Sequence, residues 1–377
     1  MLVGGGSHDL QDVRVIALTK PMRHHRSRSG YNALLPYLQP DRAIRANVTL
    51  PGRVANGVSR RLMRRWTGIE WYGVASFWGE LRAALDVHAH GCAHAYARPW
   101  ARTGGQSRDR TRLKTLVHVM YGEDLLWAMP RLVSSEALIV ATFHQPIERF
   151  RRLVGRSSAL SRLDGVFVLD EQNREHFEAI VPGRVHALRL GVDADYWSPS
   201  PAVSAHPRRC IAVGTHLRDF ELLGAMVAQL VPEGFVFDVV SGSAVLADWP
   251  RSEAVRIHRG ISDAALRMLY RQASVSILPL RGGSASNALL QAIACGVPVV
   301  ATDVGGLGIY AEGCEAVRLA APKDVAAHVA AVRALAAEGA TVRAMARMQG
   351  LAFDWRHAAE AHRRTYRAVM LQAAGSS

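Results

Sequence analysis

The sequence lacks the features that mark membrane-spanning, secreted or metal-binding proteins. No apolar run among its 377 residues approaches the roughly 20 that a membrane span needs. The first residues do not combine a basic start with a long apolar core, so we expect no secretory signal. The chain has four cysteines, Cys92, Cys210, Cys295 and Cys314. They are too widely spaced for a metal-ligand pair or a disulfide framework. We therefore expect buried free thiols in a cytoplasmic protein and no bound metal.

Lysine is also scarce, although the chain is strongly basic. Only Lys20, Lys114 and Lys323 occur, whereas Lys and Arg together number 46 against 32 Asp and Glu, which gives a net charge of +14. Such an excess attracts anions, including nucleotide phosphates, anionic lipids and nucleic acid. Because no basic stripe is interleaved with aromatic residues, we do not expect nucleic acid as a partner.

Length and composition indicate two globular domains. A chain of 377 residues exceeds one ordinary domain, and a hydrophobic content of 49% suits an α/β protein. The segment 198–207, SPSPAVSAHP, is rich in Pro and Ser and predicts a linker between the two domains.

The most informative stretch covers residues 275–306. Residues 275–280 form an apolar run typical of a buried strand, and residues 298–302 form a second one. Between them, a Gly/Ser segment at 282–286 precedes a helical run at 287–294. A strand, glycine-rich turn, helix and strand in this order build a doubly wound parallel sheet. The free N–H groups at the start of such a helix can hold a diphosphate at the carboxyl end of the sheet.

Small and polar residues occupy the turn in that unit. Ser284, Ser286 and Asn287 are good candidates to cap the helix. Gly282 and Gly283 would let the backbone approach a bulky anion closely. We therefore expect this turn to cradle a ligand, although the unit could also serve packing alone.

Another apolar run, at residues 138–142, ends close to a histidine. It predicts a buried strand that delivers His144 at its carboxyl end, where a side chain points into the cleft of an α/β domain. His144 is then either a cleft residue or a structural histidine. A run at 13–18 predicts another strand, and residues 85–89 and 116–120 are further candidate strands.

The loops after two of these strands carry polar candidates. Gly30 lies in a strongly cationic loop, which either faces an anionic ligand or is simply solvated. Glu123 and Asp124 open a helix after the strand at 116–120. Acidic residues are favourable in a first helical turn, so the two are helix-start acids or ligands of an acceptor.

Residues 56–69 predict a basic amphipathic helix. On a helical wheel its arginines lie on one side and its apolar residues on the other, namely Arg60, Arg61, Arg64 and Arg65 against Val58, Leu62, Trp66 and Ile69. This pattern is typical of a helix that lies on a membrane surface. It is equally that of a surface helix whose apolar side, including Leu62 and Trp66, packs into the core.

Two segments carry a resemblance to a known family. Residues 286–306, SNALLQAIACGVPVVATDVGG, resemble the donor-binding signature of retaining GT-B glycosyltransferases of family 4, the glycosyl transferases group 1 type. Residues 186–200, HALRLGVDADYWSPS, are similar to the family segment that ends the N-terminal domain, with Trp197 in place of the usual Phe. Gly283 and Gln291 stand where the family usually has two glutamates.

The resemblance implies an α/β GT-B fold of two Rossmann-like domains that face a cleft. It places an acceptor-binding domain at 1–200 and a donor-binding domain at 208–352. It also implies that a helix at 353–377 crosses back onto the first domain.

The activity implied by the resemblance is that of a nucleotide-sugar-dependent hexosyltransferase in carbohydrate biosynthesis. Such an enzyme transfers sugar from a UDP-, GDP- or dTDP-sugar to a hydroxyl of a small-molecule or lipid-linked acceptor, with retention and without a metal or other cofactor. The resemblance implies that His144 is the catalytic residue, that Gln291 binds the ribose of the donor and that Ile261 binds its base. The diphosphate site would comprise Gly30, Gly214, Arg218, Gly283, Ser284, Ser286, Asn287 and Ala288.

Other functions remain open on the sequence. Because both family glutamates are replaced, the chain could bind a nucleotide-sugar without catalysis. A GT-B sugar-nucleotide epimerase is another alternative. We expect a cytoplasmic location, with peripheral contact to the inner face of the membrane if the basic helix docks there, and the oligomeric state is left open.

Overall fold

The structure is a computed structural model of the chain. It describes residues 13–21, 28–46, 50–96, 115–133, 137–154, 158–247, 249 and 252–375. The basic residues 23–26 of the predicted cationic loop lie outside these ranges.

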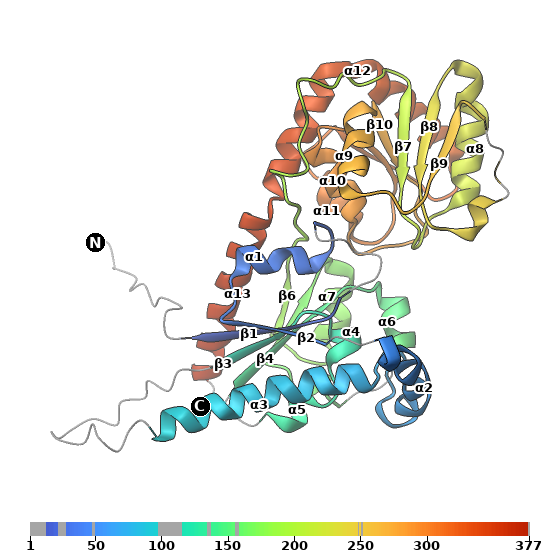
Figure 1. Cartoon of the computed structure of the whole chain (residues 1–377). Coiled ribbons are helices and arrows are strands. Elements are labelled where there is room, and N and C mark those ends of the chain that lie inside the picture. Colours follow the sequence, from blue (N-terminus) through green and yellow to red (C-terminus); the bar gives the residue numbers. More distant parts are fainter. Residues whose placement is uncertain are drawn as a thin grey trace, which may run out of the picture.

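A six-stranded parallel sheet forms the N-terminal unit (Figure 1). Its strand order is β2-β1-β3-β4-β5-β6, so the order reverses between β1 and β3. The central strands are apolar and almost fully buried, as parallel strands covered on both faces must be. The strands are β1 (Arg14–Thr19), β2 (Arg42–Arg45), β3 (Thr115–Val119), β4 (Ala137–Phe143), β5 (Gly165–Val168) and β6 (Val185–Ala187).

Helices connect these strands. They are η2 (Tyr31–Leu34), α1 (Leu35–Leu38), α2 (Leu50–Thr67), α3 (Val74–Tyr96), α4 (Gly122–Leu125), α5 (Met129–Leu132), α6 (Ile147–Leu153), η4 (Leu160–Arg162) and α7 (Glu171–Glu178). The prediction of a strand at 85–89 was wrong, because this run lies inside α3. Ala83, Ala84 and Val87 face the core there at helical spacing, and a short apolar run does not distinguish a strand from a buried helix turn.

A second six-stranded parallel sheet forms the C-terminal unit, with the order β12-β11-β10-β7-β8-β9. This is the Rossmann order, which reverses between β7 and β10. Its strands are β7 (Arg209–Val213), β8 (Val236–Val240), β9 (Val255–His258), β10 (Val275–Leu278), β11 (Val299–Thr302) and β12 (Val317–Ala320). Its helices are α8 (Phe220–Leu230), η5 (Val231–Glu233), η6 (Ala244–Ala247), α9 (Asp263–Gln272), α10 (Asn287–Ala294), η7 (Gly305–Leu307), α11 (Gly308–Ala311) and α12 (Val325–Ala352). The predicted α/β class with two parallel sheets is confirmed.

Helix α12 is long and apolar enough, by length and composition, to cross a membrane. It packs against α10 and α8, however, and buries Val329, Val332 and Leu335 in the C-terminal unit. The backbone of Gly339 is not helical, so α12 is two helical segments joined at a kink.

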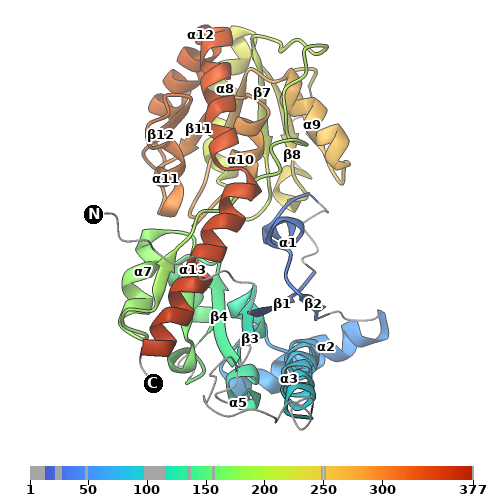
Figure 2. The same ribbon diagram turned by 90° about the vertical axis from the view of Figure 1, so that its left-hand side faces the viewer.

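The last helix, α13 (Trp355–Gly375), returns to the N-terminal unit, where it packs against α1 and η2 (Figure 2). The predicted crossing helix is thereby confirmed, whereas the exact domain boundaries stay predictions. A buried polar network joins α13 to the first sheet. The Tyr31 hydroxyl lies 2.5 Å from His362 Nε2 and 3.0 Å from Thr142 Oγ1, and His118 bonds both Thr142 and Tyr366 at 2.7 Å.

This network makes stability depend on pH. Burial lowers the pKa of His362 from 6.5 to about 4. Between these values the unfolded chain binds more protons than the folded one, so the contribution of His362 to stability falls as the pH falls. We expect the unfolding free energy of the wild type, relative to His362→Gln, to fall by about 2 kcal/mol between about pH 7 and about pH 5.

Equilibrium denaturation at both pH values measures this difference. His357→Gln, at an exposed position of the same helix, is the matched control. Taking the difference between wild type and variant cancels the opposing effect of Glu80 and Glu123, whose pKa values burial raises to about 7. A constant difference across the pH range would mean that His362 does not stay neutral in the folded state.

Candidate functional site

A cleft of about 890 Å³ lies between the two units. The loops that follow β1, β3 and β4 line one wall, and the loops that follow β7, β8, β9 and β10 line the other. Both sheets therefore turn their carboxyl edges and the points where strand order reverses toward the same space. Ligands of open α/β sheets bind in this position.

The start of α10 forms the floor of the second wall. Ser286 caps the helix, because its Oγ accepts the N–H of Leu289 at 3.3 Å. No described residue accepts from the N–H groups of Asn287 and Ala288, and both residues line the cleft. Ser286 is thus the cap among the three predicted candidates, and two N–H groups at the positive end of the helix remain for an anion.

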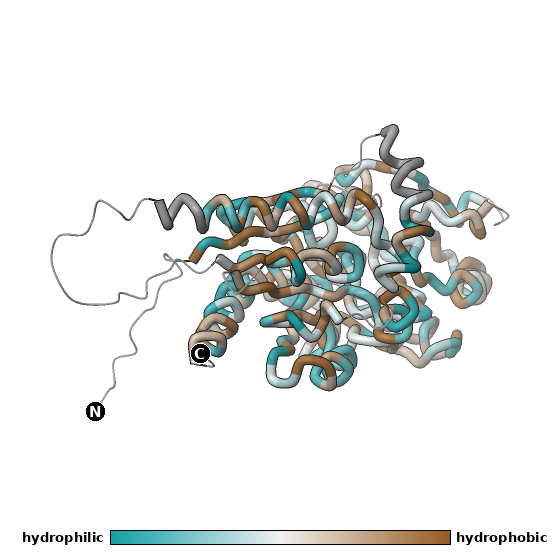
Figure 3. Tube along the Cα trace, turned by 90° about the horizontal axis from the view of Figure 1, so that it is seen from below, coloured by the Kyte–Doolittle hydropathy of each residue, from teal (hydrophilic) through white to brown (hydrophobic). Residues whose placement is uncertain are grey.

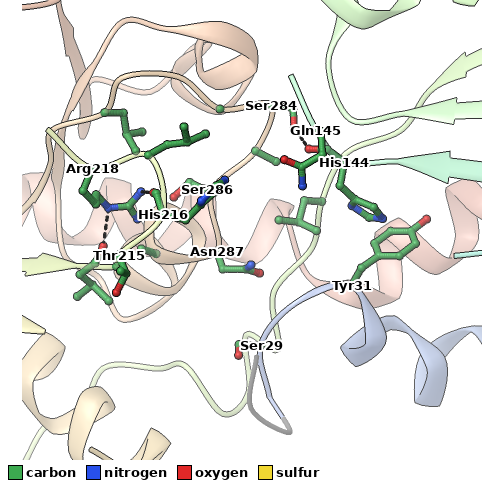
Figure 4. Close-up of a pocket in the computed structure, with 18 of the residues that line it drawn as sticks. Ser29, Tyr31, His144, Gln145, Thr215, His216, Arg218, Ser284, Ser286 and Asn287 are labelled. Carbon is green, nitrogen blue, oxygen red and sulfur yellow. Dashed lines mark hydrogen bonds between the residues drawn. The ribbon is translucent and has the colours of Figure 1, made fainter. Parts of the chain in front are cut away.

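The loop before α10 also contacts the first unit (Figure 4). Ser284 Oγ donates to the carbonyl oxygen of His144 at 2.5 Å, and the N–H of Gly30 donates to Asn287 Oδ1 at 3.2 Å. The structure therefore brings together four predicted site residues that come from both units. The carbonyl oxygen of Gly283 accepts a hydrogen bond from the N–H of Gly306 at 3.0 Å, which fixes this part of the loop.

Arg218 lies on the loop after β7. Its Nε donates to the carbonyl of Val213 at 2.9 Å and its Nη1 to the carbonyl of His216 at 3.1 Å. Gly214 makes room for it, because a Cβ at that residue would lie 2.4 Å from Arg218 Nη2. Burial lowers the pKa of Arg218 to about 10, so the guanidinium is still charged at neutral pH.

Gln291 and Ile261 both line the cleft, whereas their contacts with a ribose and a base stay predictions. Gln291 is only 5% exposed, and its side-chain amide has no hydrogen-bond partner among the described residues. Ile261 lies in the loop after β9. Tyr270, on α9, steadies the start of α10 by donating its hydroxyl to the carbonyl of Ala288 at 3.2 Å.

His144 follows β4 and is one of the residues that line the cleft. Its Nε2 lies 2.8 Å from the carbonyl of Met120, so Nε2 carries the proton and Nδ1 is the acceptor. The rings of Tyr31 and Tyr121 lie 4.7 and 4.9 Å from the imidazole, centroid to centroid. Burial lowers the pKa of His144 from 6.5 to about 4. The side chain is therefore a neutral, fixed hydrogen-bond acceptor at neutral pH.

Glu123 and Asp124 do begin a helix, α4, but neither side chain caps it. Glu123 accepts the N–H groups of His144 and Gln145 and so fixes the loop that carries the histidine. Asp124 pairs with Lys20 at 2.5 Å. Both acids line the cleft, and contact with an acceptor stays a prediction.

Sequence reasoning missed several cleft residues. Arg149 Nη1 lies 2.8 Å from His216 Nε2, which joins the two walls. Thr215 Oγ1 and Ser241 Oγ lie 3.1 Å apart at the ends of β7 and β8. Each of these residues lies within six residues of the carboxyl end of β4, β7 or β8, which is the signal that could have found them. The contact of Tyr31 with His144 had no such signal.

The part of the chain that the structure describes contains no candidate metal centre. Among the described residues, no group of three or more His, Cys, Asp or Glu is placed to hold a metal ion. Cys210, Cys295 and Cys314 are free and buried, as predicted, and the side chain of Cys92 lies outside the described residues.

Comparison with known proteins finds similarity to glycosyltransferases. Residues 208–338 match the family model described as glycosyl transferases group 1. Over 167 residues the chain is 28% identical to an MMP alpha-(1->4)-mannosyltransferase of Mycolicibacterium hassiacum, covering 39% of this chain and 38% of that protein. Over 244 residues it is 27% identical to a D-inositol 3-phosphate glycosyltransferase of Nocardiopsis dassonvillei, covering 55% and 56%. The matched part thus spans about half or less of these relatives.

The fold extends over the whole chain. The crystal structure of a glycosyltransferase from Rickettsia africae aligns with a TM-score of 0.64 at 12% sequence identity and covers 95% of this chain and 99% of that one. Taken together, the comparisons show that residues 208–338 are similar to a glycosyl transferases group 1 domain and that the chain has the GT-B fold.

Proposed function

We propose that this chain is a retaining, nucleotide-sugar-dependent hexosyltransferase. It would move a sugar from a UDP-, GDP- or dTDP-sugar to an acceptor hydroxyl, with the C-terminal unit binding the donor and the N-terminal unit the acceptor. The observation that carries the proposal is the start of α10, where two N–H groups without a described partner face a cleft opposite His144. The group 1 domain at residues 208–338 supports it.

The leaving diphosphate would bind without a metal. Asn287 and Ala288 offer backbone N–H groups at the positive end of a helix, and Arg218 adds a fixed positive charge. Donors that are already in place stabilise charge in the transition state without reorganising. Gln291 would bond the ribose, and Ile261 would pack against the base.

His144 would hold the donor sugar rather than move a proton. Its Nδ1 can accept a hydrogen bond from a sugar hydroxyl, and a pKa of about 4 leaves it no proton to give at neutral pH. The acceptor proton would then pass to an oxygen of the leaving phosphate. The bond from the anomeric carbon to phosphate breaks while the bond to the acceptor oxygen forms on the same face, which retains the configuration.

Arg218→Ala should weaken nucleoside diphosphate binding by about 1.5–3 kcal/mol, the range for a hydrogen bond to a charged group. Calorimetric titration with UDP, GDP and dTDP measures the change. Arg281→Ala is the matched control, because Arg281 lies three residues after β10 but pairs with Asp219 and Glu221 and does not line the cleft. Equal affinity in wild type and Arg218→Ala would remove Arg218 from the site.

A thermal-shift screen against the same three nucleotides tests the proposal as a whole. A ligand that binds only the folded state raises the melting temperature. At a concentration a hundredfold above its dissociation constant, it raises the free energy of unfolding by about 2.7 kcal/mol. We expect one nucleotide to stabilise the chain more than the others. No stabilisation by any of them at millimolar concentration would contradict a nucleotide-sugar donor.

A further inference from the structure

Helices α2 and α3 expose large apolar side chains to solvent. Trp66 is 81% exposed, Leu62 62%, Leu85 59% and Trp78 56%. The predicted alternative in which Leu62 and Trp66 pack into the core is therefore wrong. Of the other apolar residues in that pattern, Ile69 is buried beyond the end of α2, and the side chain of Val58 lies outside the described residues.

The apolar side chains of α3 form a stripe. Val74, Trp78 and Leu85 are spaced by four and seven residues, so they share one side of the helix. The opposite side carries Ala83 and Val87, which are buried against the first sheet. An outward helix side on a soluble domain is normally polar, and this one is not.

Helix α2 lies against the beginning of α3, since the N–H of Val74 donates to Ser59 Oγ at 3.3 Å. Figure 3 looks at the molecule from below and shows the two helices on the same side, with hydrophobic and hydrophilic positions interleaved along α3. We call the exposed residues Leu62, Trp66, Val74, Trp78 and Leu85, together with the arginines described next, the α2–α3 face.

The exposed charges of α2 are of one sign, and the turn that follows the helix carries one exposed acid, Glu70. Arg61, Arg64 and Arg65 are exposed, and residues 50–67 contain no acidic residue at all. None of the three makes an ion pair with a described carboxylate. The fourth arginine of the predicted basic side, Arg60, turns inward and lines the cleft instead.

We infer that the α2–α3 face docks on an anionic lipid bilayer. Arginines would meet lipid phosphates while tryptophan and leucine side chains enter the headgroup region, where tryptophan is enriched in membrane proteins. A second copy of the chain is a poor occupant, because a two-fold interface would place the arginines of both copies opposite each other. No spanning helix is needed for such reversible binding.

Docking would also fix where the acceptor is found. Arg60 and Trp71 belong to α2 and to the turn before α3, and both line the cleft. A docked molecule therefore brings the acceptor side of the cleft close to the bilayer. If the proposed transfer activity holds, the acceptor hydroxyl belongs to a molecule at the lipid surface.

Sedimentation with vesicles tests the docking. With phosphatidylcholine vesicles containing about a third phosphatidylglycerol, the wild type should pellet at low salt and be released as salt rises. Each arginine near an anionic surface raises the partition coefficient onto the vesicles about fivefold. We therefore expect partitioning to fall about a hundredfold in the triple variant Arg61→Gln, Arg64→Gln, Arg65→Gln. The control carries Arg152→Gln, Arg256→Gln and Arg364→Gln, which removes the same charge from exposed positions elsewhere.

A second variant tests the apolar side chains. Trp66→Ser with Trp78→Ser alters exposed residues, so it should fold normally yet lose binding to the same vesicles. Both variants should keep the wild-type affinity for nucleoside diphosphate, which separates failure of docking from failure of the proposed function. Equal pelleting of wild type and arginine variant, or none of either, would overturn the inference. So would a wild-type dimer in light scattering that the Trp66→Ser, Trp78→Ser variant abolishes.

Discussion

His144→Ala should lower turnover at least about a hundredfold while leaving nucleoside diphosphate affinity nearly unchanged. The imidazole is held in one orientation by the carbonyl of Met120 and by the rings of Tyr31 and Tyr121, so the position of its Nδ1 is fixed. A hydrogen bond with a fixed geometry near the reacting carbon stabilises the transition state more than the bound substrate. Its loss should therefore lower turnover.

The backbone contacts of His144 survive this change. Its N–H still reaches Glu123 and its carbonyl still accepts from Ser284, so the loop should keep its position. His357→Ala, at an exposed position, is the control for a general loss of activity. Full turnover in His144→Ala, or a collapse of the melting temperature, would make His144 a structural residue.

Gly305→Ala should lower turnover by about a hundredfold or more. Gly305 has a φ of +59°, and a Cβ there would lie 1.8 Å from the carbonyl oxygen of Gly283. The backbone of the donor loop must then move, and a displacement of about 1 Å at a reacting site can cost about a hundredfold in rate. The left-handed conformation adds strain for any residue with a Cβ.

Gly308→Ala is the matched control for this change. It lies three residues further on, and a Cβ there meets no atom within 4 Å. We expect it to retain activity, whereas Gly305→Ala should also bind nucleoside diphosphate more weakly in calorimetry. If Gly305→Ala binds and turns over like the wild type, the loop at 282–286 is not the diphosphate cradle.

The local order of elements could be predicted where sequence signals are short-range. The unit from β10 through α10 to β11 was expected from apolar runs, a glycine-rich turn and a capping serine, and each feature depends only on its neighbours. His144 was placed correctly because a strand end determines which side chain faces the cleft. The same rule would have found Thr215 and Ser241.

Tertiary contacts were not predictable in the same way. Ser284 meets His144 and Asn287 meets Gly30 across separations of 140 and 257 residues, and no local pattern encodes such pairs. A helical wheel grouped Arg60 with the exposed arginines of α2, but it does not show which side of a helix the cleft occupies. That side is set by how α2 packs on α3.

Donor turnover with the anomeric configuration followed by proton NMR tests the central claim most directly. The wild type is incubated with UDP-, GDP- and dTDP-hexoses, first without acceptor and then with vesicles that carry lipid-linked hydroxyl acceptors. We predict release of nucleoside diphosphate from one donor, with the sugar passed to water slowly or to an acceptor faster, and with its configuration retained. A donor that binds but stays intact, or one that is converted to an epimer with its nucleotide still attached, would contradict a glycosyltransferase.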